Sequence, residues 1–578
     1  MQEKKTLLLV NNFNDFIDRK NYFSFIPIDK NFKKYKNIKI LEYDFPTRNE
    51  ISSQYDFCIN LFNEILGKLT NKLNLIHKVN FSKREWDIII GYWLNDYIYK
   101  CYKIYIQFKY VIKKYNIQHA HLTDHKEYDF TTSDTFEFLT IESDNIDWYL
   151  SFCSKIFDYF QFTNKAKNYH SSKFFRTKFK ISKGRKITKI LNKTTNSINK
   201  VLKINDNAFI AGTSLPFYEE KKLQFHFNKF PYFYNFKNIK DEKYNLKLRE
   251  SISFKVDKSK KTIENFILEN INIFLPKSFL ENFQKIKNIA NSNIFPKNPK
   301  FIFTSYLHAF DENFKTYAAF KTRDKKPYYV SQHGNNCFTR IHNNHSREFY
   351  YTDKFFSWGY KDNHKIDKLF NFKTLKKLKN NKQGNFLIVF DFIRNIPDTL
   401  YLTPNSIMEN ILRSKKFIKN LDPKIQSKII LRLNSDFFAK VYGIKYFELF
   451  NDLNVKIDKG GTNMENLIEE SRIVLFTYDS TNFLENYVHD IPSIIFCNPN
   501  YLNSIDKKFY PRYLDLQRNK VMFTNVEEIS NHINLIWNDP KKWWGSKETK
   551  QCLENFNKDL NTKPYKGCFD DLISKLKY

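Results

Sequence analysis

The sequence predicts an α/β protein built from two doubly wound, Rossmann-like domains that enclose a cleft. Three observations support this prediction. Short apolar runs recur along the chain and end in polar turns, which is typical of strands buried on both faces of a parallel sheet. Stretches of helical length and pattern separate these runs. At 578 residues the chain is also too long for a single hydrophobic core.

The expected strands are apolar almost throughout. They are 6–10, 208–212, 301–305, 327–332, 385–390, 428–433, 473–478 and 493–497. The expected helices are 54–77, 86–115, 146–162, 262–287, 311–323, 406–420, 463–471, 481–489 and 526–537. Ligands of such folds bind beyond the carboxyl ends of the strands, so polar residues that directly follow a strand are the candidates for a site.

A lysine- and asparagine-rich stretch divides the chain before the strand at 385. We therefore expect an N-terminal domain over 1–365, a linker over 366–384 and a compact C-terminal domain over 385–545. Residues 546–578 are expected to form a helical tail that can cross back toward the first domain.

The chain carries 95 basic and 62 acidic side chains, a net charge of +33. This excess favours anionic partners: phosphorylated small molecules, an anionic membrane surface or nucleic acid. No zinc-finger spacing, RNP-type motif or GXXG loop occurs, so nucleic acid is not expected. The basic segment 170–193 is either a solvated helix face or a patch that faces phosphates or anionic lipid.

The seven cysteines are scattered and include no CxxC pair, the pattern of a reducing compartment and not of a zinc site. No apolar run reaches the length of a membrane span, and the first residues do not look like a signal peptide. We expect a cytoplasmic protein that can contact the inner face of the cell membrane. No metal or cofactor is expected.

The first candidate site is "PYYVSQHGNNC" (327–337), where Gln332, His333 and Gly334 follow a buried strand. A histidine there can act as a general base or donate to a phosphate, and a glycine lets a ligand approach the backbone. The alternative is a histidine that only caps a core element.

The second candidate lies in "ESRIVLFTYDSTNFLENYVHDIPSIIF" (470–496). Asp479, Ser480 and Thr481 end a strand and start a helix, whose first turn can hold a phosphate. Glu485 follows one turn later and could reach a ribose. The alternative is an ordinary Ser/Thr helix cap. The GxxxxGK[ST] pattern is absent, so the motif does not predict NTP hydrolysis.

Two further candidates are charged. Arg432 follows the strand at 428–433 and suits a phosphate or carboxylate, or else a surface salt bridge. Asp311 and Glu312 stand at the start of the helix at 311–323, as catalytic carboxylates or because carboxylates favour helix N-termini.

Several motifs carry a resemblance to a known family. "REWDIIIGYWL" (84–94), "SQHGNNC", "TDKFFSWGY", the 470–496 motif and "INLIWNDPKKWW" resemble transferases from bacterial O-antigen and surface-polysaccharide regions. More distantly, the layout is similar to GT-B glycosyltransferases that use CMP-sugars (Kdo and sialic-acid-type transferases). It is also similar to the CDP-glycerol glycerophosphotransferases of teichoic acid synthesis.

The resemblance implies a metal-independent GT-B glycosyltransferase with an acceptor-side N-terminal domain and a nucleotide-sugar-binding C-terminal domain. The favoured donor is a CMP-activated 2-keto acid sugar, and the acceptor is a saccharide or lipid-linked saccharide of a surface polysaccharide. His333 becomes the base, with Asp311 or Glu312 as the other candidates. Gln332, Gly334, Arg432, Asp479, Ser480, Thr481 and Glu485 become substrate contacts. A CDP-polyol phosphotransferase and an inactive GT-B scaffold are the alternatives.

Overall fold

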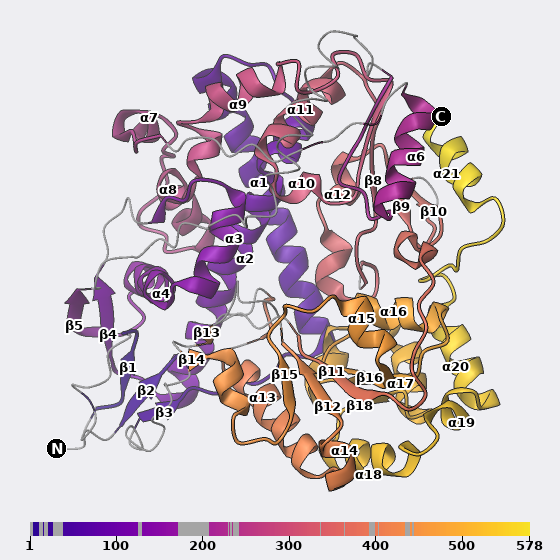
Figure 1. The fold of residues 1–578 in the computed structure, drawn as a ribbon. Coiled ribbons are helices and arrows are strands. Elements are labelled where there is room, and N and C mark those ends of the chain that lie inside the picture. Colours follow the sequence, from indigo (N-terminus) through magenta and orange to yellow (C-terminus); the bar gives the residue numbers. More distant parts are fainter. Residues whose placement is uncertain are drawn as a thin grey trace.

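The structure is a computed structural model of the chain (Figure 1). It describes residues 4–10, 16, 21–26, 38–124, 130–170, 207–228, 231, 234, 242–335, 337–362, 365–391, 399–402, 404–433, 440–441 and 444–577. The basic segment singled out above, apart from His170, lies outside these ranges. Within the described ranges no helix is both long and apolar enough to cross a bilayer.

The C-terminal sheet has the strand order of a Rossmann fold. It consists of β11 (Asn385–Val389), β12 (Ile429–Arg432), β15 (Lys456–Asp458), β16 (Ser471–Phe476), β17 (Ser493–Phe496) and β18 (Met522–Phe523). All are parallel, in the order β15-β12-β11-β16-β17-β18. The order reverses between β11 and β16, and such a reversal is where Rossmann sheets bind ligands.

The middle sheet lies above the C-terminal sheet in Figure 1. It consists of β6 (Ala208–Ile210), β7 (Phe301–Thr304), β8 (Tyr328–Ser331), β9 (Lys354–Ser357) and β10 (Ile366–Lys368), all parallel and in chain order. Alternate strand residues belong to two separate cores, so both faces of the sheet are covered. The chain thus has the α/β fold predicted, with parallel sheets covered by helices.

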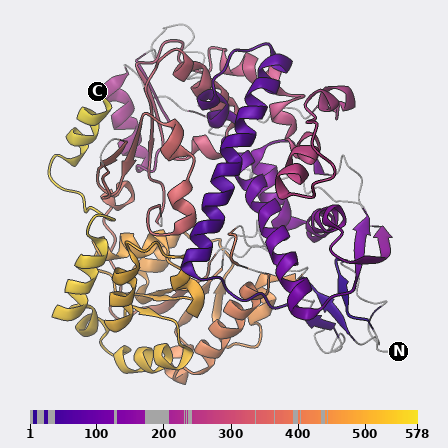
Figure 2. The ribbon, with the colours of Figure 1, turned by 180° about the vertical axis from the view of Figure 1, so that it is seen from behind.

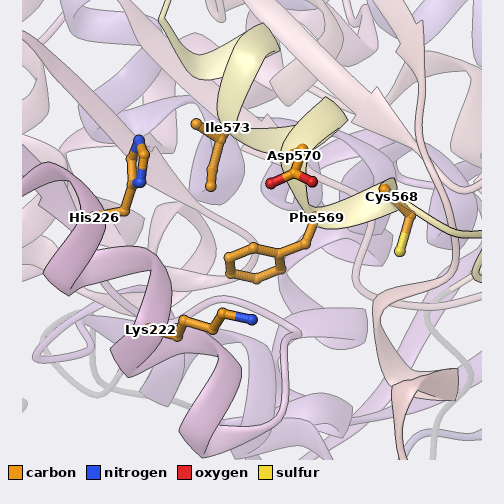
Figure 3. Close-up of a pocket in the computed structure, with 7 residues that line it drawn as sticks. Lys222, His226, Cys568, Phe569, Asp570 and Ile573 are labelled. Carbon is orange, nitrogen blue, oxygen red and sulfur yellow. The ribbon is translucent and has the colours of Figure 1, made fainter.

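The last helix of the chain covers one face of the middle sheet. α21 (Cys568–Leu576) packs its Leu572 and Leu576 into the same core as Ile210 and Phe303. It lies beside α6 (Phe217–Phe227) at the edge of the molecule (Figures 1 and 2). Between these helices is a cavity of about 310 Å³, in which Lys222 and His226 of α6 face Phe569 and Asp570 of α21 (Figure 3).

Residues 1–365, expected as one domain, contain a further sheet. It consists of β1 (Thr6–Leu8), β2 (Tyr22–Ser24), β3 (Ile38–Ile40), β4 (His119–Asp124) and β5 (Asn164–His170), in the parallel order β3-β2-β1-β4-β5. Of these strands only β1 was predicted. The others are very short or polar, as in "HAHLTD" of β4, so they lack the apolar run on which the prediction relied.

Two long helices connect all three sheets, as Figure 2 shows. The start of α1 (Arg48–His77) lies against the C-terminal sheet's loops, where Arg48 donates to the carbonyls of Leu502 and Ile505. The start of α2 (Lys83–Tyr115) lies against the middle sheet, where Arg84 donates to the carbonyl of Tyr351.

The eight predicted strands are all present, and the predicted helices differ in one place. The stretch 262–287 forms two helices, α8 (Ile263–Phe274) and α9 (Phe283–Ala290), because Pro276 cannot continue a helix. The expected linker 366–384 begins with β10, whose sequence Ile-Asp-Lys is too polar to suggest a strand.

The remaining α-helices and the β-hairpin are mostly short. They are α3 (Thr135–Asp144), α4 (Ile146–Phe160), α7 (Leu246–Ser251), α10 (Leu307–Phe310), α11 (Glu312–Arg323), α12 (Glu348–Tyr351), α13 (Pro404–Lys419), α14 (Pro423–Gln426), β13 (Lys440–Val441), β14 (Ile444–Lys445), α15 (Met464–Glu469), α16 (Thr481–Val488), α17 (Tyr510–Arg518), α18 (Val526–Ile536), α19 (Pro540–Trp544) and α20 (Lys547–Asn557). The 3₁₀ turns are η3 (Lys277–Phe279), η4 (Ile341–His345), η5 (Phe372–Leu375), η7 (Tyr446–Phe450) and η8 (Pro499–Ser504).

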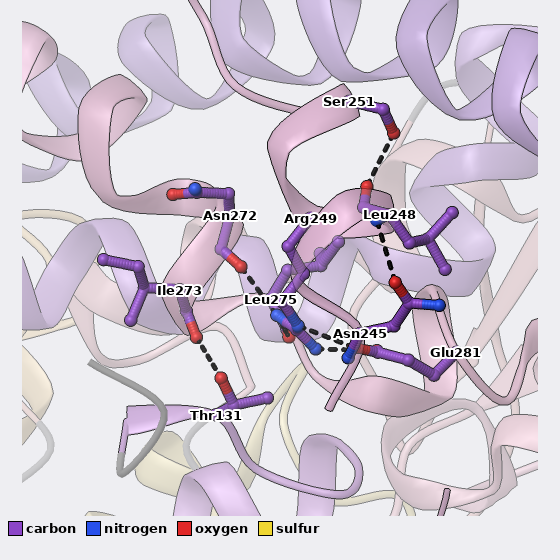
Figure 4. Close-up of polar contacts among 9 residues, drawn as sticks. All are labelled: Thr131, Asn245, Leu248, Arg249, Ser251, Asn272, Ile273, Leu275 and Glu281. Carbon is purple, nitrogen blue, oxygen red and sulfur yellow. Dashed lines mark hydrogen bonds and ion pairs between the residues drawn. The ribbon is translucent and has the colours of Figure 1, made fainter. Parts of the chain in front are cut away.

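A buried ion pair holds the helical layer around α7 to α9 (Figure 4). Arg249 Nε and Nη2 each donate to a carboxylate oxygen of Glu281 at 2.7 Å. Arg249 Nη1 also donates to the carbonyls of Asn272 and Leu275, at 2.6 and 2.9 Å. Both side chains are almost completely buried, so each charge depends on the other for its stability.

We expect Arg249→Ala to destabilise this layer by about 3–5 kcal/mol, because it leaves Glu281 buried without its counter-charge. Hydrogen exchange over residues 245–275 should accelerate accordingly. Lys285→Ala is the control, since Lys285 pairs with Glu242 at the surface and exposed pairs contribute at most about 1 kcal/mol. Equal exchange in the two variants would show that the buried pair does not hold the layer.

Candidate functional site

The loop after β8 meets the start of α16, which joins the carboxyl ends of the middle and C-terminal sheets. The Asn335 backbone N–H donates to Thr481 Oγ1 at 2.9 Å, and Asn335 Nδ2 donates to Asp479 Oδ1 at 2.5 Å. A Cβ atom at Gly334 would lie 3.3 Å from Thr481 Oγ1, so a side chain there would crowd the contact. The two motifs found in the sequence are therefore in direct contact.

Asp479 is buried at the centre of this junction. Besides the Asn335 amide, its carboxylate accepts hydrogen bonds from the hydroxyls of Tyr501, at 3.2 Å, and Tyr513. Burial raises the pKa of Asp479, while Tyr513 and the charge of Arg340 oppose that rise. These contacts occupy the carboxylate within the protein, so the structure favours a structural role for Asp479 over the predicted substrate contact.

Ser480 and Thr481 stand at the start of α16 as predicted. Ser480 caps the helix by accepting from the Asn482 N–H at 3.2 Å, and it donates to the Tyr478 hydroxyl at 3.1 Å. This geometry matches the cap interpretation for Ser480. Thr481 is only half-buried, so its hydroxyl and the helix N-terminus remain the part of the motif that is placed to meet a phosphate.

His333 is reached by solvent even though protein surrounds it. The His333 side chain is exposed to solvent. The surrounding protein nevertheless desolvates the ring and lowers its pKa to about 4, with a smaller contribution from the charge of Lys373. The exposure of His333 indicates that a ligand can reach the ring. The lowered pKa indicates that the imidazole is neutral at pH 7.

The positive charge of Lys373 acts on Glu485 as it does on His333. Glu485 lies one turn into α16, is half-buried and accepts from Asn482 Nδ2 at 3.1 Å. Burial raises its pKa to about 7, and Lys373 opposes that rise. His333 and Glu485 come from different sheets, and the charge of Lys373 acts on both of them.

Gln332 shapes the loop that carries His333. Its side-chain oxygen accepts from the Trp358 N–H at 2.9 Å, and its amide donates to the Gly334 carbonyl at 2.8 Å. The side chain is buried. These bonds favour a positioning role for Gln332 over the predicted contact with substrate.

Arg432 lies at the carboxyl end of β12 and forms an ion pair with Asp458 at the end of β15. Only β11 separates β12 from β16, so Arg432 is at the same sheet edge as Thr481. The pair with Asp458 nevertheless favours the salt-bridge interpretation over a phosphate contact.

Asp311 and Glu312 behave as helix-start carboxylates. Asp311 accepts from the N–H groups of Asn313 and Phe314, both at 3.0 Å, and burial raises its pKa to about 6. Glu312 accepts from the Thr135 N–H at 2.9 Å and pairs with Lys315 at 2.7 Å. Both are buried, so their contacts favour the structural alternative over catalysis.

Two residues near His333, His308 and Lys373, were missed from the sequence, and Glu348 was not connected with His308. His308 follows β7 as His333 follows β8, and that parallel was the available signal. Glu348 lies 4.0 Å from His308 but is distant from it in the chain. Lys373 lies in the lysine-rich stretch taken as a linker, where no single lysine stands out. Among the described residues, no cluster of His, Cys, Asp or Glu is suited to hold a metal ion.

We expect Asn335→Ala to loosen the junction, because it removes the amide donor from the buried Asp479, at a cost of about 1–3 kcal/mol. Hydrogen exchange should rise together at residues 333–340 and 479–488. Asn519→Ala is the control, because the Asn519 amide donates to Asp515 in its own helix region and interacts with Cys552 of α20, on neither side of this junction. A rise on one side alone would contradict a shared junction.

Three solved structures show distant similarity to this chain. The spinosyn rhamnosyltransferase SpnG is 10% identical, with a TM-score of 0.28 over 51% of this chain and 80% of that chain. A protein described as a UDP-N-acetylglucosamine 2-epimerase from Listeria monocytogenes is 12% identical, with a TM-score of 0.32 over 51% and 77%. S. aureus MnaA, solved with UDP, is 12% identical, with a TM-score of 0.32 over 52% and 80%. A search of curated proteins returned no match.

Comparison with family models found one that spans nearly the whole chain. The model of the LIC12162 family transferases matches residues 22–564, which includes all three sheets except β1. The sequence predicted a transferase, and this match confirms that class. The chain belongs to the LIC12162 family of transferases.

Proposed function

We propose that this transferase moves a glycosyl group from a nucleotide-activated donor to a saccharide or lipid-linked saccharide acceptor. The observation that supports it best is the junction itself. An accessible, neutral histidine on the middle sheet lies next to the start of a helix at the switch point of a Rossmann sheet. Such a switch point suits a nucleotide, and a neutral imidazole suits removal of a proton from a hydroxyl.

In this proposal the acceptor oxygen bonds to the anomeric carbon as the bond from that carbon to the donor phosphate oxygen breaks. His333 takes the hydroxyl proton, and the nucleotide leaves with the electron pair of the broken bond. The start of α16 with Thr481, together with Lys373, stabilises the charge on the leaving phosphate. A phosphate near His333 also raises the pKa of the ring and makes it a stronger base.

The donor that we favour is a CMP-activated 2-keto acid sugar, as the family resemblance implies, with a CDP-polyol as the alternative. Glu485 is the candidate contact to the donor ribose. Its carboxylate is half-buried on the same helix as Thr481, one turn beyond the phosphate position. The proposed reaction requires no metal.

We place the reaction in the cytoplasm, at the inner face of a membrane that carries a surface-polysaccharide acceptor. All seven cysteines are free and buried, as suits a reducing compartment. The net charge of +33 and the exposed aromatics Tyr218 and Phe225 of α6 suit contact with anionic lipid. Failure to co-sediment with anionic vesicles would remove the membrane from the proposal.

A panel of CMP, CDP, UDP and GDP tests the donor class by thermal shift, because a ligand that binds the native state raises Tm. We expect CMP to stabilise the protein most. A larger shift with CDP would favour the polyol alternative. No shift with any of the four would contradict a nucleotide site at the junction.

We expect His333→Ala to lower kcat by roughly 10²- to 10⁴-fold, as loss of a general base does, while the CMP-induced shift in Tm stays. His119→Ala is the matched control, because His119 begins β4 in the N-terminal sheet. Wild-type transfer by His333→Ala would assign the base elsewhere. A protein that binds CMP but transfers nothing even with His333 intact would be an inactive scaffold.

A further inference from the structure

His308 and Glu348 are buried titratable side chains next to His333. His308, in α10, is 1% exposed, and Glu348, at the start of α12, is 3% exposed. His308 Nε2 lies 4.0 Å from Glu348 Oε1, and the rings of His308 and His333 are 6.4 Å apart between centroids. His308 is therefore the middle member of a chain of three titratable groups that ends at the accessible His333.

This pair lacks the hydrogen bonds that buried polar groups normally have. Among the described residues, neither ring nitrogen of His308 has a hydrogen-bond partner, and Glu348 Oε2 has none. Unsatisfied buried groups destabilise a fold, so they are rare and often mark a catalytic role. A movement of about 1 Å would bring the 4.0 Å contact to hydrogen-bond distance.

The helix that carries Glu348 is held firmly by α2. Arg347 forms a buried ion pair with Asp87, with Nε 3.1 Å from Oδ1. Arg84 Nε donates to the Tyr351 carbonyl at 2.8 Å. These contacts fix both ends of α12, so Glu348 keeps its place beside His308 although its own carboxylate is poorly bonded.

Burial determines which of the three titratable groups, Glu348, His308 or His333, holds a proton. It lowers the pKa of His308 to about 3, with further lowering by His333 and Lys315. It raises the pKa of Glu348 to about 7, against the charge of Arg347. Near neutral pH, Glu348 is therefore the member that can gain or lose a proton while both imidazoles stay neutral.

We propose that His308 and Glu348 act as a proton relay behind His333. His333 takes the acceptor's proton on one ring nitrogen and passes the proton of its other nitrogen to His308. His308 in turn passes a proton to the Glu348 carboxylate. Both imidazoles finish neutral with their tautomers exchanged, and Glu348 finishes as a carboxylic acid, so no cation is left in the buried interior. The relay rests on the proposed function.

Titratable and charged groups on several neighbouring elements act on this relay. Some of these groups interact electrostatically with His308 or Glu348, and Tyr92 of α2 packs its ring against His308. They lie on α2, α11, β8, α12 with the residue before it, and the loop after β8. They are Tyr92, Lys315, Tyr328, Arg347, Tyr351, His333 and Cys337. Only Lys315 and Arg347 of these are cationic at neutral pH. Arg347 is paired with Asp87 and Lys315 with Glu312, so Glu348 is the titrating group expected near pH 7.

The relay predicts that kcat falls as pH drops through about 7, because the Glu348 carboxylate is lost as it gains a proton. We expect Glu348→Gln to lower kcat roughly 10- to 100-fold, as removal of a group that acts through another typically does. The acidic limb near pH 7 should disappear, and KM and the CMP-induced shift should not change. Glu348→Asp should restore the limb in part. The control is His345→Gln. His345 is a second histidine near a carboxylate, that of Asp56, in the same region. We expect the kcat of this variant to stay within twofold of that of the wild type.

Infrared titration of the protein without donor provides a readout that does not need activity. We expect the carboxylic-acid absorption that titrates near pH 7 to be smaller in Glu348→Gln than in the wild type, and not absent, because burial also raises the pKa of Glu485 to about 7. An unchanged kcat, an unchanged acidic limb or an unchanged absorption near pH 7 in Glu348→Gln would overturn the relay. If the wild type transfers no sugar from any nucleotide donor, the proposed function fails, and the relay fails with it. A defect in the variant alone concerns only the relay.

Discussion

The contact between Asn335 and the start of α16 is the constraint on which the site depends. It joins the carboxyl ends of two parallel sheets through a backbone N–H, a side-chain amide and a buried carboxylate. Gly334 permits the contact because a Cβ there would crowd Thr481. Asp479 in turn receives the hydroxyls of two tyrosines. The network holds the loop that carries His333 against the start of the helix that carries Glu485.

The N-terminal sheet and helices α1 and α2 serve as the frame for this pair of sheets. Arg48 anchors α1 on the C-terminal sheet's loops, and Arg84 and Asp87 anchor α2 on α12. This gives a physical account of the motif "REWDIIIGYWL": two of its charged residues hold the helix that presents Glu348. The motif therefore affects the site through the position of α12.

Burial is the main influence on protonation around the junction. It lowers the pKa of the two histidines and raises that of Glu348 and Glu485. All four shifts favour the neutral form, as desolvation requires. The exposed Lys373 supplies a positive charge where the two sheets approach. Neutral bases beside a cation and a helix N-terminus suit a reaction in which a hydroxyl loses its proton and an anionic nucleotide departs.

The sequence by itself determined the α/β class, the eight apolar strands and the two loops of the site, because buried parallel strands and polar strand ends have a local signature. It did not determine which polar residues are free to bind. Arg432 and Asp479 looked like ligands but are held by Asp458 and by two tyrosines. Nor did it reveal His308 and Glu348 as a pair. Pairing between residues distant in the chain depends on how the elements pack, and only the tertiary structure decides that.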